Sequence, residues 1–164
     1  MFLIGPDIGS YPAAGAPGRL GLRTVVLILV LSLPAFAALG SDESSIQADQ
    51  AQMRASLRTT RTATYTVHEL QAPTGHLVRE YVSPTGTVFG VAWHGPSKPD
   101  LRQILGTHFD EFMQAAQANR RGHGPLVVNL PGLVVSSGGH MRAFSGRAYL
   151  PQMLPEGVSA DSMR

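Results

Sequence analysis

Residues 62–93 read TATYTVHELQAPTGHLVREYVSPTGTVFGVAW, and this stretch decides the fold. Its side chains alternate with a period of two over Thr62–Leu70, His76–Val82 and Thr87–Trp93, which are rich in the Thr, Val, Tyr and Phe that favour strands. The loops between them, residues 72–75 and 83–86, both end in Pro-Thr-Gly. Proline suits the first central position of a type I turn, and glycine supplies the left-handed residue that closes a three-residue hairpin loop. The stretch therefore predicts a three-stranded antiparallel meander.

The turn geometry also predicts the register of the meander. If Ala72 faces His76, the facing pairs of the first hairpin are Val67 with Tyr81, His68 with Glu80 and Glu69 with Arg79. If Ser83 faces Thr87, those of the second are Tyr81 with Phe89, Arg79 with Val91 and Leu77 with Trp93. One face then collects the larger apolar side chains. The other face is smaller and more polar, and a helix is expected to approach it closely at Gly90 and Ala92.

Helical periodicity flanks the meander on both sides. Within residues 38–61, Ser41–Ser45 offers capping residues, and Ile46, Met53 and Leu57 form the narrow apolar stripe of an N-terminal helix. After the meander, Ser97 and Asp100 have capping-box spacing. Apolar residues then repeat at three and four positions from Leu101 to Ala116, which predicts the main amphipathic helix, with Gly106 marking a bend or close packing.

The remaining sequence completes an α+β fold. Leu126–Leu130 and Leu133–Ser136 flank Pro131-Gly132 and predict a second hairpin, and residues 138–150 predict one more short strand. Residues 151–164 have little to bury and are expected to be a disordered tail. We therefore predict a single domain over residues 62–150, with a mostly antiparallel sheet packed by the main helix and the shorter N-terminal helix.

Residues 1–37 have the pattern of a secretory signal peptide with an N-terminal extension. Arg19 and Arg23 precede the apolar run Val25–Leu33, and Ala35-Phe36-Ala37 follows as an A-x-A cleavage site. The run falls short of the roughly 18 apolar residues that a membrane span needs. We expect cleavage near Ala37, no stable membrane span afterwards, and a periplasmic or secreted mature chain.

Composition excludes several function classes. Once the leader is removed, the 13 basic and 11 acidic residues become 11 and 10, so the mature chain has no electrostatic footprint for nucleic acid. The chain has no cysteine, which removes thiolate nucleophiles and cysteine-ligated zinc. Its six histidines include no His-x-His, His-x₃-His or HExxH pattern. The repeated tripeptides at His94 and His123 lie roughly 30 Å apart if the intervening helix is continuous. We predict no metal and no cofactor.

Three stretches resemble a bacterial exported family of unknown function, family 2844. They are Tyr65–Glu69 (YTVHE), Val78–Pro84 (VREYVSP) and Ser137–Pro151 (SGGHMRAFSGRAYLP), and the resemblance covers roughly Ala38 to Pro155. It implies export and a single domain, and it implies no functional residue.

Two constellations are candidates for chemistry. The facing pair His68 and Glu80 has the residue types of a general acid–base site, although no serine or threonine is placed by the sequence as a nucleophile, and such a pair is also an ordinary exposed sheet contact. In Ser136–Arg142, the adjacent Gly138 and Gly139 are candidates for an anion-binding nest of backbone N–H groups. His140, Arg142 and Arg147 lie nearby and could pair with a carboxylate or phosphate. The alternative is a purely structural role for the two glycines, as a bulge in a strand.

These observations favour an exported, non-enzymatic domain that binds an envelope protein or a small anionic ligand. The alternative is a periplasmic hydrolase or lyase that uses His68, Glu80 and His140. An enzyme of that kind is expected to bring the three side chains into one concave pocket, whereas a binding domain is expected to show a contiguous exposed apolar or Gly/Arg patch.

Overall fold

The computed structural model describes residues 39–118 and 124–164. The signal peptide predicted over residues 1–37 lies outside these residues, as do Arg120, Arg121 and Gly122, where the main helix was expected to end. No helix in the described part of the chain is long and apolar enough to cross a bilayer.

The described residues form one antiparallel sheet with the strand order β1-β2-β3-β4-β7-β6-β5. Its strands are β1 (Ser56–Arg61), β2 (Thr66–Gln71), β3 (Leu77–Val82), β4 (Val88–Gly95), β5 (Leu126–Asn129), β6 (Val134–His140) and β7 (Ala143–Tyr149). The α-helices are α1 (Ile46–Met53), α2 (Leu101–Leu105) and α3 (Phe109–Ala118). Short 3₁₀ helices are η1 (Glu43–Ser45), η2 (Gly106–His108), η3 (Pro151–Met153) and η4 (Ala160–Ser162). The predicted α+β class is confirmed.

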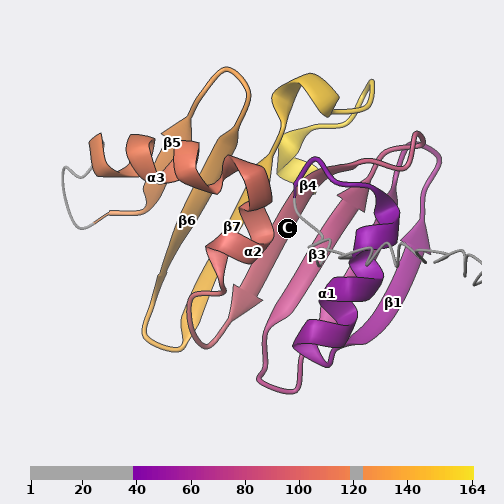
Figure 1. The fold of residues 1–164 in the computed structure, drawn as a ribbon, viewed down its shortest axis with the longest axis horizontal. Coiled ribbons are helices and arrows are strands. Elements are labelled where there is room, and N and C mark those ends of the chain that lie inside the picture. The colour runs from indigo at the N-terminus through magenta and orange to yellow at the C-terminus, as the bar shows by residue number, and fades with distance from the viewer. Residues whose placement is uncertain (1–38, 119–123) are drawn as a thin grey trace, which may run out of the picture. The chain divides into compact units, whose positions relative to one another are not determined.

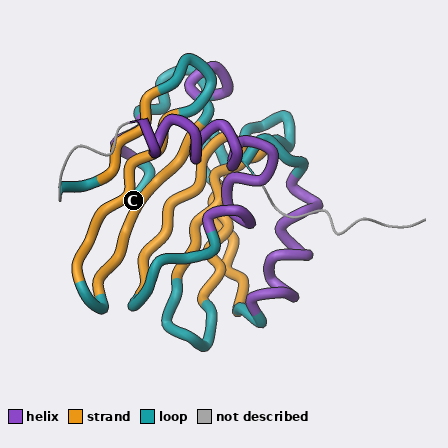
Figure 2. The backbone as a smooth tube through the Cα atoms, turned by 60° about the vertical axis from the view of Figure 1, so that its left-hand side comes forward, coloured by secondary structure: helices purple, strands orange, loops and turns teal. Residues whose placement is uncertain are grey.

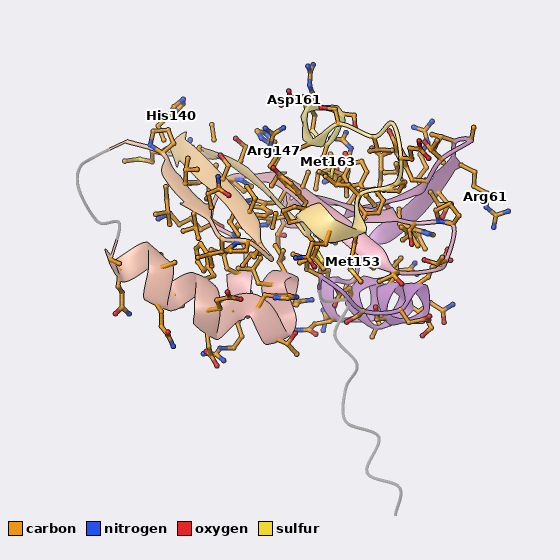
Figure 3. The ribbon with its side chains drawn as sticks, turned by 90° about the horizontal axis from the view of Figure 1, so that it is seen from above. Arg61, His140, Arg147, Met153, Asp161 and Met163 are labelled. Atoms are coloured by element: carbon orange, nitrogen blue, oxygen red, sulfur yellow. The ribbon has the colours of Figure 1, made fainter. Side chains whose placement is uncertain are left out.

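The two sides of the sheet are covered differently. The three α-helices lie on one side, which we call the helix side (Figures 1 and 2). Residues 154–164 lie on the other, which we call the tail side (Figure 3). The main apolar core lies between sheet and helices and includes Leu105, Phe112, Val128 and Val135. A smaller cluster of Tyr81, Phe89, Ala92 and Met163 lies on the tail side.

The two Pro-Thr-Gly turns form as predicted. Gly75 and Gly86 have φ angles of 87° and 83°, the left-handed region that the turn requires. Ala72 donates its N–H to the carbonyl of His76 at 2.8 Å, and Ser83 donates to Thr87 at 2.9 Å. The β2–β3 register is also confirmed, because Val67 faces Tyr81, His68 faces Glu80 and Glu69 faces Arg79.

The predicted register of β3 and β4 is wrong by one residue beyond the turn. Val82 faces Val88, but Tyr81 faces Gly90, because a β-bulge between Tyr81 and Val82 leaves Phe89 as an extra residue. Arg79 therefore faces Ala92 instead of Val91, and Leu77 faces His94 instead of Trp93. A one-residue shift moves side chains to the opposite face. As a result, Val91 and Trp93 join the main core, whereas Gly90 and Ala92 lie on the tail side.

The N-terminal helix is shorter than the range 38–61 predicted for it. It ends at Met53, where Arg54 takes a left-handed conformation with φ 49°, and Ser56–Arg61 forms the edge strand β1. Leu57, placed on the helical stripe from the sequence, instead pairs with Leu70 of β2. The threonines of this segment favour a strand, and the narrow stripe of the helix gave little reason to extend it.

The main helix is interrupted at Gly106. The helix begins with Asp100 as its N-cap, which accepts N–H groups from Arg102 and Gln103, so the capping residue is Asp100 and not Ser97. Gly106 has a φ of 52°; α2 ends before it, at Leu105, and η2 begins with it and leads into α3. The predicted second hairpin is confirmed about Pro131-Gly132, and the additional strand is β7, which pairs with both β6 and β4.

Residues 151–164, expected to be disordered, are ordered, and residues 154–164 pack against the tail side of the sheet. Met163 is only 1% exposed and lies over Gly90, where a Cβ atom would collide with its sulfur. The absence of a side chain at Gly90 therefore leaves the space in which Met163 packs against the sheet. From the sequence alone, one buried methionine was too small a signal to predict order.

Candidate functional site

The structure separates the predicted catalytic and ligand-binding residues into three places. His68 and Glu80 lie on the helix side of the sheet, and both are buried. His140 and Arg142 lie at the exposed end of the β6–β7 hairpin (Figure 3). Gly138, Gly139 and Arg147 line a groove on the tail side.

His68 is held between a carboxylate and a hydroxyl group. Its Nε2 lies 2.9 Å from Glu43 Oε1, and its Nδ1 lies 3.0 Å from Thr59 Oγ1. A carboxylate only accepts hydrogen bonds, so Nε2 carries the proton, and in the neutral ring Nδ1 accepts from the threonine hydroxyl. His68 also lines a pocket of about 360 Å³ with Glu43. Sequence reasoning missed both partners, because Thr59 and Glu43 lie outside the predicted meander.

Glu80 belongs to a different polar cluster. Its side chain is 1% exposed and is hydrogen-bonded to Asp49 of α1, which is 4% exposed and accepts from Gln103 Nε2 at 2.9 Å. Burial first, and then the charge and hydrogen bond of Asp49, raise the pKa of Glu80 well above its ordinary value. Glu80 is therefore the protonated partner and donates to Asp49. Asp49 falls three residues after Ile46 on the helical stripe, and that spacing was the signal that sequence reasoning missed.

The acid–base pair predicted from the sequence is thus not an isolated exposed contact. His68 and Glu80 face each other across β2 and β3, but the hydrogen bonds described for them join each to other residues of the described chain. His140 lines a pocket with Lys98 and Phe144. It lies far along the chain from both His68 and Glu80. The structure thus places His68 and His140 in different pockets.

Gly138 and Gly139 are part of a strand and do not form the predicted anion-binding nest. Gly138 and Gly139 lie in β6 and face Ser145 and Phe144 of β7. Successive N–H groups of a strand point to opposite edges, so they do not converge into a nest. A Cβ atom at Gly139, where φ is 131°, would collide with the carbonyl oxygen of Ala143. The glycines therefore permit close approach of backbones.

Arginine side chains gather in the groove on the tail side, which we call the arginine groove. It has a volume of about 640 Å³, and its lining includes Arg79, Arg147, Arg164 and His94, together with Ser136 and Ser145. No aspartate or glutamate is among the described residues that line it. Trp93, the only tryptophan of the chain, also borders the groove, while its ring packs against Gly146 in the main core. Figure 3 shows Arg147 beside Asp161 and Met163, on the side of the sheet opposite the helices.

Each of two groove arginines has a carboxylate partner and further hydrogen-bonding capacity. Arg79 Nε lies 2.6 Å from Glu69 Oε1, and Arg147 Nη2 lies 3.0 Å from Asp161 Oδ1. The side chains of both arginines are 32% exposed. A guanidinium has five N–H donors, so a pair with one carboxylate oxygen leaves others to bind an anion.

The described residues contain no group of three or more His, Asp or Glu side chains that could hold a metal ion. His123, the second histidine of the repeated tripeptide, lies outside the described residues.

The architecture and the groove define a single-sheet α+β domain with a cationic surface channel. Residues 35–163 match the model of the family described as "Protein of unknown function (DUF2844)", and the chain belongs to this family. Neither the curated proteins nor the solved structures include a match to this chain.

Proposed function

We propose that this chain is an exported, non-enzymatic binding domain of the cell envelope, and that its arginine groove binds a small anionic ligand. The observation that carries the proposal is the lining of the groove, in which three arginines and a histidine meet without an acidic side chain among the described lining residues. Its volume of about 640 Å³ is in the range of small-molecule sites.

The chemistry of the lining favours a phosphate or carboxylate group. Arginine forms charge-assisted and often bidentate hydrogen bonds with such groups, and Ser136 and Ser145 add hydroxyl donors beside it. Of the residues predicted from the sequence, Gly138, Gly139 and Arg147 line this groove, whereas His140 and Arg142 do not. The proposed site therefore keeps three of the five predicted ligand-binding residues and adds Arg79 and Arg164.

Trp93 provides a fluorescence probe of binding, because it is the only tryptophan and borders the groove from the main core. The mature chain is titrated with inorganic phosphate and separately with succinate, at constant ionic strength, and its fluorescence is recorded. We expect a saturable change, with Arg147→Gln weakening the affinity about tenfold through loss of a charged hydrogen-bond donor. Arg61→Gln is the matched control, since Arg61 is exposed at the opposite end of the sheet from His140 (Figure 3).

Two results would reject the groove as the site. One is a fluorescence change that fails to saturate with either anion. The other is an equal loss of affinity in the Arg147→Gln and Arg61→Gln variants, which would indicate general charge screening. Capture of an envelope protein by the full mature chain, without anion binding, would instead favour a protein partner.

Export is tested by the N-terminus of the recovered protein. The apolar run Val25–Leu33 is short and is followed by the A-x-A site, so the exported chain is expected to begin at Ala38 or Leu39. N-terminal sequencing or intact mass of the protein from the periplasmic fraction measures this directly. A membrane-bound species that retains Val25–Leu33 would contradict it.

The second candidate function is a hydrolase, favoured by the contacts of His68. The chain Glu43–His68–Thr59 has the carboxylate, imidazole and hydroxyl types of a nucleophilic site, with distances of 2.9 and 3.0 Å. In this candidate Thr59, not a residue of the meander, supplies the nucleophile. Turnover of an activated ester that is lost in both Thr59→Val and His68→Asn, with folding retained, would support it. Equal rates in these variants and the parent would exclude it.

A further inference from the structure

The arginine groove already contains an anionic group, supplied by the chain itself. Arg147 Nη2 donates to Asp161 Oδ1 at 3.0 Å, and Arg147 Nη1 donates to the carbonyl of Ala160 at 2.8 Å. Both acceptors belong to the segment Leu154–Arg164, which we call the strap. Met163 and Arg164 of the strap also line the groove. The strap is therefore both a wall of the groove and a source of acceptors for its arginine.

Few interactions hold the strap on the sheet. Met163 is its one buried residue, and its other described residues are exposed or half-buried. The sheet holds the strap through side-chain hydrogen bonds. Arg147 donates to Ala160 and Asp161, and Arg79 and Tyr81 donate to the main-chain oxygen of Arg164. The Tyr81 hydroxyl also accepts the N–H of Arg164 at 3.1 Å. Within the strap, backbone hydrogen bonds span three residues, as from Met163 to Ala160 at 3.2 Å. Segments with little buried area and local hydrogen bonds open at low free-energy cost.

Asp161 itself is poorly anchored. Its side chain is 81% exposed, whereas that of Arg147 is 32% exposed. An exposed ion pair of this kind contributes little to stability, so another anion can replace the carboxylate at small cost. Arg147, in contrast, is fixed in the middle of β7, between β4 and β6, where it faces Ala92 and Ser136.

We infer that Asp161 occupies, within the same chain, the position on Arg147 that the anionic group of an external ligand takes, so that the strap regulates access to the groove. This inference rests on the proposed function of the groove. Ligand binding and strap docking then compete for one guanidinium. The anion exchanges with Asp161 on Arg147, and the strap loses its two hydrogen bonds to that side chain. Arg79, which lies on β3 outside the strap, remains available to the ligand.

The test compares two aspartates of nearly equal exposure. Asp161→Asn removes the competing charge, and Asp110→Asn is the matched control, because Asp110 is 80% exposed and lies in α3 on the helix side. Inorganic phosphate is titrated into the full mature chain and followed by Trp93 fluorescence. We expect Asp161→Asn to bind phosphate about twofold to fivefold more tightly than the parent, the range set by an exposed ion pair, and Asp110→Asn to bind as the parent does.

Hydrogen exchange supplies the second measurement. Saturating phosphate is expected to accelerate exchange of the Ser162 and Met163 amides, which donate to Ser159 and Ala160 in the docked strap. Weaker or unchanged affinity in Asp161→Asn would overturn the inference, because Asp161 would then support the site instead of competing for it. Tighter phosphate binding by Asp161→Asn without faster exchange would also overturn the inference. The removal of one negative charge would then explain the higher affinity without any movement of the strap. If Arg147→Gln retains full affinity, the proposed function itself fails, and the two failures are thereby distinguished.

Discussion

The two sides of the sheet differ in how they hold what covers them. On the helix side, a continuous apolar core joins the sheet to α1, α2 and α3. On the tail side, a small cluster around Met163 and a few side-chain hydrogen bonds hold the strap. The difference indicates that stability resides mainly on the helix side. The tail side is then free to carry binding, since a weakly held cover can be exchanged.

The helix side also contains the one acidic pair that is buried in the described chain, Asp49 and Glu80. Charged groups in that position are costly unless they are neutralised or paired, and the proton shared by these carboxyl groups meets this requirement. On the tail side Arg79 and Arg147 are only partly buried, and each is paired with a carboxylate, that of Glu69 or Asp161. The buried carboxyl groups therefore contribute to the fold, whereas the partly exposed arginines stay accessible to a ligand.

The largest effect that tests this comparison is the loss of a core aromatic side chain. Phe112→Ala is expected to lower the free energy of unfolding by about 3–5 kcal/mol, because Phe112 is 2% exposed within the main core. Met163→Ala is expected to cost nearer 2 kcal/mol, since the strap can settle into the space. Chemical denaturation of both variants measures the two values. An equal loss would show that both sides contribute alike to stability.

The second effect is a pH dependence that originates on the helix side. The pKa of Glu80 is raised from an ordinary value of 4.5, so above that pH the native state keeps a proton that the unfolded chain releases. The free energy of unfolding is therefore highest below the ordinary pKa and falls as the pH rises through the native pKa. Each unit of separation corresponds to about 1.4 kcal/mol.

Glu80→Gln isolates this contribution. Glutamine stays neutral and can donate to Asp49, so the decline in stability as the pH rises above 4.5 is expected to flatten in this variant. His68, Glu43 and Gln103 also face this region and remain unchanged, which assigns any difference to position 80. Glu111→Gln, at an exposed position of α3, is the control. A decline of the same size in Glu80→Gln and the parent would refute the assignment.

The sequence predicted the parts of the fold that local chemistry determines. The Pro-Thr-Gly turns placed β2, β3 and β4, and the first turn fixed the register of β2 and β3, because hairpin geometry depends on a few adjacent residues. The bulge at Tyr81/Val82 could not be predicted in this way. It depends on how β4 pairs with β7 and on the space that Gly90 leaves for Met163, and both partners are distant in the sequence.

The candidate site was predictable only in part for the same reason. Gly138, Gly139 and Arg147 were identified because they lie within one short motif. Arg79, Arg164 and Asp161 were missed, since only the folded sheet brings β3, β7 and the strap together. Asp49 was missed on the helix side because its partner, Glu80, is 31 residues away and its burial depends on α1 lying over β3.

The smallest expected effect concerns the exposed end of the β6–β7 hairpin, where the sequence is most motif-like. His140 and Arg142 are exposed and do not line the arginine groove, although Arg142 takes a left-handed conformation with φ 69°. Alanine has the same preference against that conformation as arginine, so Arg142→Ala adds no backbone strain. We expect His140→Ala and Arg142→Ala to change the free energy of unfolding by no more than about 0.5 kcal/mol and to leave phosphate affinity at the parental value. Thermal melting and Trp93 titration of both variants measure these quantities together.

If Arg142→Ala weakens phosphate binding as much as Arg147→Gln does, the site extends to the hairpin end, and the division between a binding groove and a structural hairpin is wrong. If instead only stability falls, the hairpin contributes to the fold in a way that its exposure does not indicate.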